Sequence, residues 1–287
     1  MNLLTLIKKG NLTIIGVHDA ISAIVSQRFG AKALWVSSLG LSTVSGVPDS
    51  NILTWSESLQ MVKHIRDATT IPILVDADTG YGDVAIFQRV VKEYERIGVN
   101  GLCIEDKIFP KRNSFLSRKG SAMCMPIDMC AKIRVAVKTR KSKNFIIVAR
   151  IESFIEGVGL DDAKNRADLY KKAGADVIVI HSKKETPDEI YSFTKKWHKL
   201  PIICIPTTYH KEPKKDLFKH NVNAVILANQ ILRSYIESIK GTMGGLNDDY
   251  IRTNLMEDAM TTVKEIFSLT KTDKLLTLEK DSYGKSV

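Results

Sequence analysis

Three carboxylates follow apolar segments in a way that suggests a metal site. Asp76 and Asp78 lie two positions apart at the end of the apolar run 71–75, and Glu105 ends the next such run. Residues two apart on a strand point to the same face, so we expect both Asp side chains to face one pocket. Buried carboxylates repel one another unless a cation compensates, and oxygen-only ligation favours a hard ion such as Mg²⁺. For any single Asp, capping of the next helix or pairing with lysine is the alternative.

A second group of side chains can hold an anion. Arg150 and Glu152 also lie two positions apart at the end of an apolar run. A planar guanidinium suits a carboxylate, phosphate or phosphonate, and a structural Arg–Glu pair is the alternative. His181 ends another run, where it either donates to an anionic substrate or satisfies a backbone carbonyl.

Two shorter segments carry polar residues in predicted turns. Ser37 and Ser38 lie in "WVSSLGLS", where a strand passes into a turn whose backbone N–H groups can bind an oxyanion. Asp49 lies in the polar loop "GVPDSN" and, taken by itself, is a turn residue.

The segment "EDKIFPKRNSF", residues 105–115, opens a long connection. About twenty residues pass before the next predicted helix near Asp128, and loops of this length in compact domains are usually functional. Lys107, Lys111 and Arg112 make it basic, which predicts a lid that closes over an anionic ligand and excludes water. A solvated basic loop is the alternative.

The chain contains eight short apolar runs, and several of the candidate residues lie at their ends. Nearly continuous hydrophobicity is typical of strands that are covered on both faces of a parallel sheet. The runs are 12–19, 33–38, 71–78, 101–106, 145–152, 177–182, 201–207 and 224–229.

Amphipathic stretches between the runs predict helices. They include 55–68, 84–97, 162–173 and 188–197, and several stop at a glycine. Strand followed by helix, repeated eight times, predicts an α/β fold of the (β/α)8 TIM barrel type. A doubly wound open sheet is the rival, but no G-x-G-x-x-G follows any strand.

Polar residues end most of the predicted strands. In a barrel the carboxyl ends of all strands converge on one face, where active sites are built. We therefore expect these strand-end residues to meet in one pocket: Asp19, Ser37, Ser38, Asp76, Asp78, Glu105, Asp106, Arg150, Glu152, His181, Ser182, Thr207 and Asn229.

Length, hydrophobic content and net charge argue against some classes of partner. The 287 residues are 44% hydrophobic, which suits one large globular domain or two small ones. The formal net charge is +10, but the lysines are spread along the chain and form no basic block interleaved with aromatics. We therefore expect no nucleic-acid partner. We also expect no membrane association, because the apolar N-terminal stretch is too short for a secretory signal and no run reaches spanning length.

The four cysteines indicate a reducing compartment. Cys103, Cys124, Cys130 and Cys204 lack zinc-ligand or redox spacing, which fits a cytoplasmic protein. Cys103 and Cys204 lie inside apolar runs and are expected to be buried as small hydrophobic residues.

Four segments together resemble a known enzyme superfamily. "VDADTGYGD", "EDKIFPKRNS", "VARIE" and "VIVIHSKK" are similar to the isocitrate lyase/phosphoenolpyruvate mutase superfamily, and within it to the phosphoenolpyruvate mutases. The likeness runs from about Gly16 to Lys280. "EDKIFPKRNS" fits the E-D-K-five-residues-N-S pattern typical of mutases and is the most specific piece, whereas "DADTGYG" identifies only the superfamily.

The resemblance implies a metal site and an aspartate on a gating loop. Asp76 and Asp78, with Glu105 nearby, match the residues that hold Mg²⁺, partly through water. Asp49 matches the Asp of a gating loop placed close to the transferring phosphoryl group. Whether this Asp is a covalent carrier or only steers the group stays open.

The resemblance also implies a substrate site. The remaining candidates match residues that shield or bind substrate: Lys111, Asn113 and Ser114 in the lid, Arg150 and His181 at strand ends, and Ser37, Ser38 and Leu39 in the turn. Asn113 is expected to contact the phosphoryl end. Ser38 stands where many relatives have Gly, so we expect the backbone contacts there to persist with slightly altered packing.

The implied reaction interconverts phosphoenolpyruvate and phosphonopyruvate, making a C–P bond for phosphonate biosynthesis. The family's equilibrium lies toward phosphoenolpyruvate, so a coupled downstream step, commonly a decarboxylase, is expected. Phosphonopyruvate hydrolase is the nearest alternative, although Asn113 argues against it. A carbon–carbon lyase is less favoured, because those enzymes carry a catalytic Cys in a K-[KR]-C-G-H lid and this lid has no Cys before Cys124. A binding or regulatory protein that kept the fold is the non-catalytic alternative.

The C-terminal part is predicted to extend beyond the barrel. We expect a catalytic domain at residues 1–245 and a helical extension and tail at 246–287, in which 258–269 forms an amphipathic helix. By resemblance, such helices are exchanged between subunits, which implies a homodimer or homotetramer.

Overall fold

The computed structural model describes residues 2–111, 123–246 and 260–283. The chain forms two compact units, Met1–Gln230 and Ile231–Val287, and each is described by itself. No helix among the described residues combines the length and the apolar character that crossing a lipid bilayer requires.

The first unit is a closed barrel of eight parallel strands in sequence order. The strands are β1 (Leu12–Val17), β2 (Leu34–Val36), β3 (Ile73–Asp76), β4 (Gly101–Glu105), β5 (Ile146–Ile151), β6 (Val177–Ile180), β7 (Ile202–Cys204) and β8 (Ala224–Leu227). Strand β1 pairs with both β2 and β8, which closes the barrel. The predicted (β/α)8 fold is therefore confirmed, and each predicted apolar run contains one strand.

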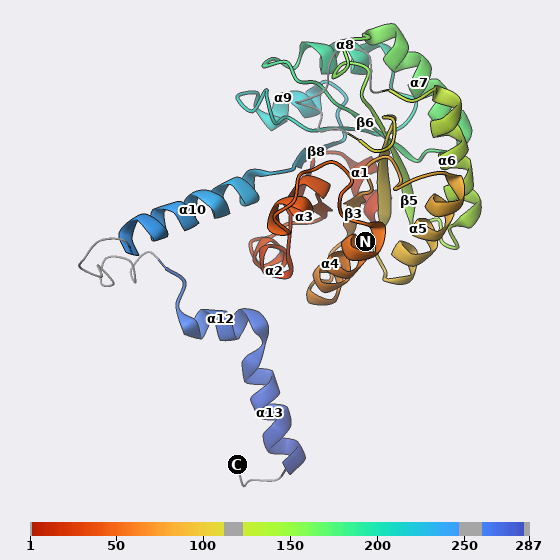
Figure 1. Cartoon of the computed structure of the whole chain (residues 1–287). Helices are drawn as coiled ribbons and strands as arrows, with labels where there is room; N and C mark the ends of the chain where they lie inside the picture. Colours follow the sequence, from red (N-terminus) through yellow and green to blue (C-terminus); the bar gives the residue numbers. More distant parts are fainter. Residues whose placement is uncertain (1, 112–122, 247–259, 284–287) are drawn as a thin grey trace. The chain divides into compact units, whose positions relative to one another are not determined.

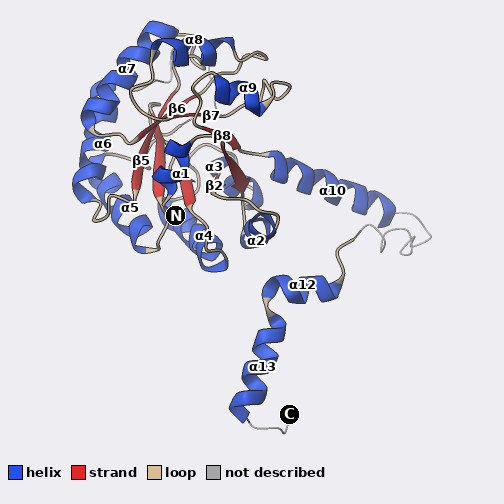
Figure 2. Cartoon of the chain, turned by 180° about the vertical axis from the view of Figure 1, so that it is seen from behind, coloured by secondary structure: helices blue, strands red, loops and turns tan. Residues whose placement is uncertain are grey.

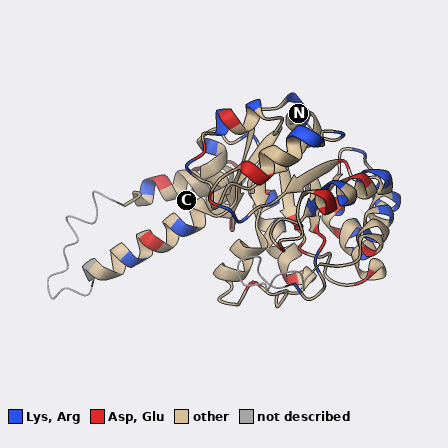
Figure 3. Ribbon diagram, turned by 90° about the horizontal axis from the view of Figure 1, so that it is seen from above, with Lys and Arg blue, Asp and Glu red and all other residues tan. Residues whose placement is uncertain are grey.

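Helices cover the outside of the strands (Figures 1 and 2). They are α2 (Ala20–Arg28), α3 (Ser38–Val44), α4 (Trp55–Ala68), α5 (Val84–Arg96), α6 (Pro126–Thr139), α7 (Leu160–Ala173), α8 (Asp188–Lys196) and α9 (Lys214–Lys219), with α1 (Leu3–Lys9) before β1. The predicted helix 55–68 is confirmed to the residue, and the other three predicted helices agree within two residues at either end. Lys and Arg residues are spread over several of these helices (Figure 3).

Local sequence signals set where helices begin and end. Asp19 and Thr54 form capping boxes at α2 and α4, and Asp83 accepts from two backbone N–H groups at the start of α5. Gly174 ends α7 in the left-handed conformation, as the glycine stop predicts.

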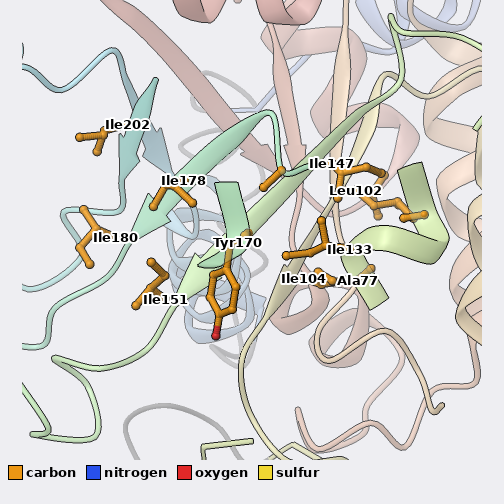
Figure 4. Close-up of a cluster of buried hydrophobic side chains, with 14 of the residues drawn as sticks. Ala77, Leu102, Ile104, Ile133, Ile147, Ile151, Tyr170, Ile178, Ile180 and Ile202 are labelled. Carbon is orange, nitrogen blue, oxygen red and sulfur yellow. The ribbon is translucent and has the colours of Figure 1, made fainter. Parts of the chain in front are cut away.

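Alternating side chains divide the core into two layers. One set fills the barrel interior and includes Ile14, Leu74 and Val148, with Leu3 and Ile7 of α1 packed against it. The other set lies between strands and helices; Figure 4 shows part of it, from Leu102 and Ile104 on β4 to Ile133 on α6. Cys103 and Cys204 are both buried, as predicted.

The second unit is helical. It contains α10 (Gln230–Leu246, which begins at the unit boundary), α12 (Val263–Thr270) and α13 (Thr272–Tyr283). The helix predicted at 258–269 begins at Val263, because the Thr262 side chain accepts from Glu265 N and caps it there. The separate roles assigned to residues 1–245 and 246–287 stay a prediction.

Candidate active site

One pocket lies at the carboxyl ends of the strands. Its walls come from strand ends and from the connections that follow them, so the barrel gathers residues far apart in sequence. The lining residues are Trp35, Ser37, Ser38, Leu39, Asp49, Asp76, Lys111, Arg150, His181, Ile205, Thr207, Ala228 and Asn229. Eight of the twelve candidate residues are among them.

Asp76 and Asp78 come together through a turn rather than through strand alternation. Strand β3 ends at Asp76, and Asp78 has a φ of 51°, so the prediction that both lie on one strand was wrong. The Asp78 N–H donates to Asp76 Oδ1 at 3.2 Å, which closes the turn. Gly80 and Gly82 also have positive φ, a conformation that glycine adopts without steric cost. The "DADTGYGD" sequence thus builds a tight turn that presents two carboxylates.

The Lys111 ammonium lies between the acidic residues. Its Nζ is 2.5 Å from Asp78 Oδ1 and 2.9 Å from Asp49 Oδ1, and it donates to Ser38 Oγ at 2.9 Å. Ser38 Oγ in turn donates to Asp76 Oδ2 at 3.3 Å. The hydroxyl at position 38, where a Gly was noted in many relatives, therefore joins this cluster.

Asn51 is a functional candidate that the sequence analysis missed. Its Nδ2 donates to Asp78 Oδ2 at 2.8 Å, and its Oδ1 accepts from the Lys111 N–H at 2.6 Å. Asn51 has a φ of 55°, a conformation that Asn tolerates better than most residues. The sequence shows that the "GVPDSN" loop is polar, but the spacing of Asn51 does not indicate a partner 60 residues away.

Burial and mutual repulsion shift the titration of the acidic cluster. Burial raises the pKa of Asp76 to about 7, and the Asp78 charge acts in the same direction against Lys111 and Arg150. Burial also raises the pKa of Glu105, although Arg150 opposes it. Burial alone would lower the pKa of Lys111, but the surrounding carboxylates outweigh it and raise that pKa. These carboxylates therefore favour added positive charge.

The donor set fits Mg²⁺. Asp49, Asp76, Asp78 and Glu105 present four carboxylates, and among the described residues Lys111 and Arg150 contact them with cationic side chains. A hard divalent ion takes oxygen ligands, and Mg²⁺ usually binds through one or two carboxylates and keeps several waters. Within the described ranges, no three His, Cys, Asp or Glu side chains form a ready-made cage for an ion.

Arg150 uses each side of its guanidinium for a different partner. Nη1 is 3.2 Å from Glu105 Oε2, Nε donates to Glu152 Oε1 at 2.6 Å, and Nη2 lies 2.9 Å from His181 Nδ1. The structural Arg–Glu pair raised as an alternative is thus present, but Arg150 also lines the pocket. Burial, together with the Arg150 charge, lowers the pKa of His181, although Glu152 opposes this shift.

Some polar strand-end residues turn away from the pocket, so the expectation that all would meet there was wrong. Asp19 caps α2, and Ser182 Oγ donates to Glu189 Oε2 at 2.5 Å. Asp106 accepts from Tyr170 OH at 2.7 Å and pairs with Arg166 at 3.2 Å. Each has a nearby partner on a following helix, which satisfies its polar atoms outside the pocket.

The remaining candidates lie outside the lining set or outside the described residues. Asp78 and Glu105 contact the pocket through Lys111 and Arg150. Asn113 and Ser114 lie outside the described residues.

Comparisons with known proteins find a matching family model and similar chains. The model of the phosphoenolpyruvate phosphomutase family matches residues 3–246. The chain is 39% identical to a phosphoenolpyruvate phosphomutase of Tetrahymena pyriformis over 268 residues, which cover 93% of this chain and 89% of that protein.

Two solved structures are similar over nearly the whole chain. A crystal structure of phosphoenolpyruvate phosphomutase from Streptomyces platensis subsp. rosaceus matches with a TM-score of 0.94 at 33% identity, covering 97% of each chain. A phosphonopyruvate hydrolase in complex with oxalate and Mg²⁺ matches with a TM-score of 0.89 at 32% identity, covering 96% of each chain.

Replacing Asn51 with Gly should loosen the contact between the 46–51 loop and Lys111. Glycine keeps the positive φ but removes both side-chain hydrogen bonds, each worth about 1 kcal/mol or more beside a charged group. We expect the amides around residue 51 and at Lys111 to exchange with solvent about tenfold faster, measured by hydrogen exchange with mass spectrometry. Asn221→Gly is the matched control, because Asn221 also has positive φ, at 62°. Unchanged exchange in Asn51→Gly would contradict the bridging role.

Proposed function

Because the chain belongs to the phosphoenolpyruvate phosphomutase family, we propose that it is an isomerase that interconverts phosphoenolpyruvate and 3-phosphonopyruvate with Mg²⁺ as cofactor. The observation that carries this proposal is the convergence of Asp49, Lys111 and the acidic turn in one buried pocket. Phosphoryl transfer between two ends of one molecule needs charge stabilisation and exclusion of water, and this pocket supplies groups for both.

Asp76, Asp78 and Glu105 are the residues we assign to Mg²⁺. When bound there, the ion would stabilise negative charge on the pyruvate enolate oxygen. Their crowding supports the assignment, because the elevated pKa of Asp76 reflects a carboxylate that lacks sufficient compensating charge.

We assign substrate binding to other residues that line the pocket. Arg150 offers a guanidinium to an anionic group, and His181 presents its second ring nitrogen beside it. Ser37, Ser38 and Leu39 would bind substrate oxygens through hydroxyl and backbone N–H groups at the junction of β2 and α3.

Asp49 and Lys111 are assigned to the phosphoryl group in transit. In the forward direction the bond between phosphorus and the enol oxygen breaks, and phosphorus bonds to the C3 carbon of the same molecule. Lys111 would spread the charge of the moving group, and Asp49 holds the ammonium in place at 2.9 Å. Asn113 and Ser114 are proposed to shield the same group from water.

The product would carry a C–P bond, which implies a role in phosphonate biosynthesis. The reducing compartment inferred from the cysteines is consistent with a cytoplasmic location.

Phosphonopyruvate hydrolase is the second candidate, favoured by the similarity to a solved hydrolase. A coupled assay separates the two: phosphonopyruvate with Mg²⁺ should yield phosphoenolpyruvate, detected through pyruvate kinase and lactate dehydrogenase with ADP. Free phosphate and pyruvate formed without ADP would instead identify a hydrolase.

Chelation of the metal should abolish turnover, and readdition of Mg²⁺ should restore it. Full activity in a chelator would overturn the metal assignment.

Asp49→Ala should lower kcat by about 100-fold or more while substrate still binds, because the variant loses a group that acts on the moving phosphoryl unit. The measurement is steady-state kinetics of phosphonopyruvate conversion. Asp67→Ala is the control, since Asp67 is an exposed Asp paired with Lys63 on α4. A kcat equal to that of the wild type would remove Asp49 from the mechanism.

We also propose that the protein is a homodimer or homotetramer with exchanged C-terminal helices. On α10, Tyr235, Ile239 and Met243 are exposed apolar residues four apart and thus share one helix face. Light scattering should give two or four times the chain mass of 32.0 kDa, and Ile239→Glu should reduce it. Lys240→Glu, on the same helix, should leave the mass unchanged. A monomeric wild type would contradict this proposal.

A further inference from the structure

Glu152 is a fully buried carboxylate that does not line the pocket. It nevertheless contacts both side chains assigned to the substrate anion. Its Oε1 accepts from Arg150 Nε at 2.6 Å and lies 3.0 Å from His181 Nδ1. Burial would raise the pKa of Glu152, but Arg150 and His181 outweigh it and hold that pKa well below its ordinary value. The Glu152 carboxylate therefore lies directly behind the two side chains assigned to the substrate anion.

The end of β4 holds Glu152 from two directions. Glu105 faces Arg150, whereas the next two residues turn to Glu152 instead. Asp106 Oδ1 accepts from the Glu152 N–H at 2.9 Å, and Lys107 Nζ lies 3.3 Å from Glu152 Oε2. Both the backbone and the carboxylate of Glu152 are thus held by consecutive residues of the "EDK" sequence.

These two supports are themselves anchored. Tyr170 OH and Arg166 on α7 bind the second oxygen of Asp106, at 2.7 and 3.2 Å. Lys107 is fully buried and also lies 3.6 Å from Glu156. A buried charge is costly unless paired, so this arrangement restricts Glu152 to one position.

Contacts on all three nitrogens set the orientation of the Arg150 guanidinium. If Glu152 no longer accepted from Nε, Glu105 at 3.2 Å and Asp76 at 4.0 Å would still attract the group among the described residues, and we expect it to turn toward them. His181 would be affected as well, because its Nδ1 lies 2.9 Å from Arg150 Nη2 and 3.0 Å from Glu152 Oε1. The ring nitrogen left for a ligand is Nε2.

We propose that Glu152 is a positioning residue, which orients Arg150 and His181 toward the anionic group of the substrate without touching the substrate itself. The inference rests on the proposed function for the identity of that substrate. It assigns the Asp and Lys of the "EDK" sequence a supporting role through Glu152.

Glu152→Gln tests this with little change in shape. Losing a hydrogen bond between charged groups corresponds to about a 10- to 100-fold change, so kcat/KM for phosphonopyruvate should fall by that factor, mainly through KM. Asp176→Asn is the matched control: it also converts a carboxylate paired with an arginine, Arg140, but at the opposite end of β5, where Asp176 accepts from Ile147 N. The control should stay within about threefold of wild type.

A spectroscopic readout separates positioning from stability and from the proposed function. The ¹⁵N signals of the His181 ring, assigned with His181→Gln, should shift in Glu152→Gln and stay unchanged in Asp176→Asn. This readout needs no turnover, so an enzyme inactive on phosphonopyruvate would refute the proposed function while the His181 signals still test Glu152. Unchanged signals together with a wild-type KM in Glu152→Gln would overturn the inference.

The double variant Lys107→Met/Glu152→Gln covers the case in which the single variant fails to fold. Removing both charges keeps the Lys107–Glu152 pair neutral, whereas Glu156 loses its contact with Lys107, so the unfolding midpoint should recover part of the way toward that of wild type. The KM should remain raised and the His181 signals displaced, because the negative charge behind Arg150 is still missing. Recovery of KM together with stability would show a purely structural pair and overturn the inference.

Discussion

Repulsion among buried carboxylates at the mouth of the barrel is the constraint on which the site depends. The closed sheet forces the ends of β3 and β4 together, and the acidic residues there lose solvent. Lys111 and Arg150 compensate part of this charge from opposite sides. The proposed Mg²⁺ site follows from the same cause as the barrel, because the fold that brings these carboxylates together also removes the water that would otherwise stabilise them.

Lys111 links this charge balance to the 46–51 loop and to the acidic turn. Its ammonium reaches Asp49 from the 46–51 loop and Asp78 from the acidic turn, while its backbone N–H donates to Asn51. Two loops that are distant in sequence thus both contact the Lys111 ammonium. A change in charge within the pocket would therefore alter the contacts between these two loops and Lys111.

Sequence reasoning located residues more reliably than it explained their placement. The repeated strand pattern predicted the barrel and hence the gathering of Asp76, Arg150 and His181, because convergence of strand ends follows from topology alone. It was wrong about how Asp78 reaches Asp76, since a positive-φ turn is not visible in strand periodicity. Asn51 was missed for a related reason: long-range side-chain pairing between loops has no local signature.

The "EDK" sequence shows why a specific motif need not mark residues that meet the substrate. Glu105 pairs with Arg150, which lines the pocket, whereas Asp106 and Lys107 hold Glu152, which then orients Arg150 and His181. Residues beyond the end of a strand need not alternate between its faces, so two neighbouring residues of a three-residue motif can hold the same supporting side chain. Because such a support must satisfy buried charges as well as fix geometry, it tolerates fewer residue types than an exposed binding residue does. The choice of residues in this motif is therefore restricted by packing and charge pairing behind the pocket as well as by contacts inside it.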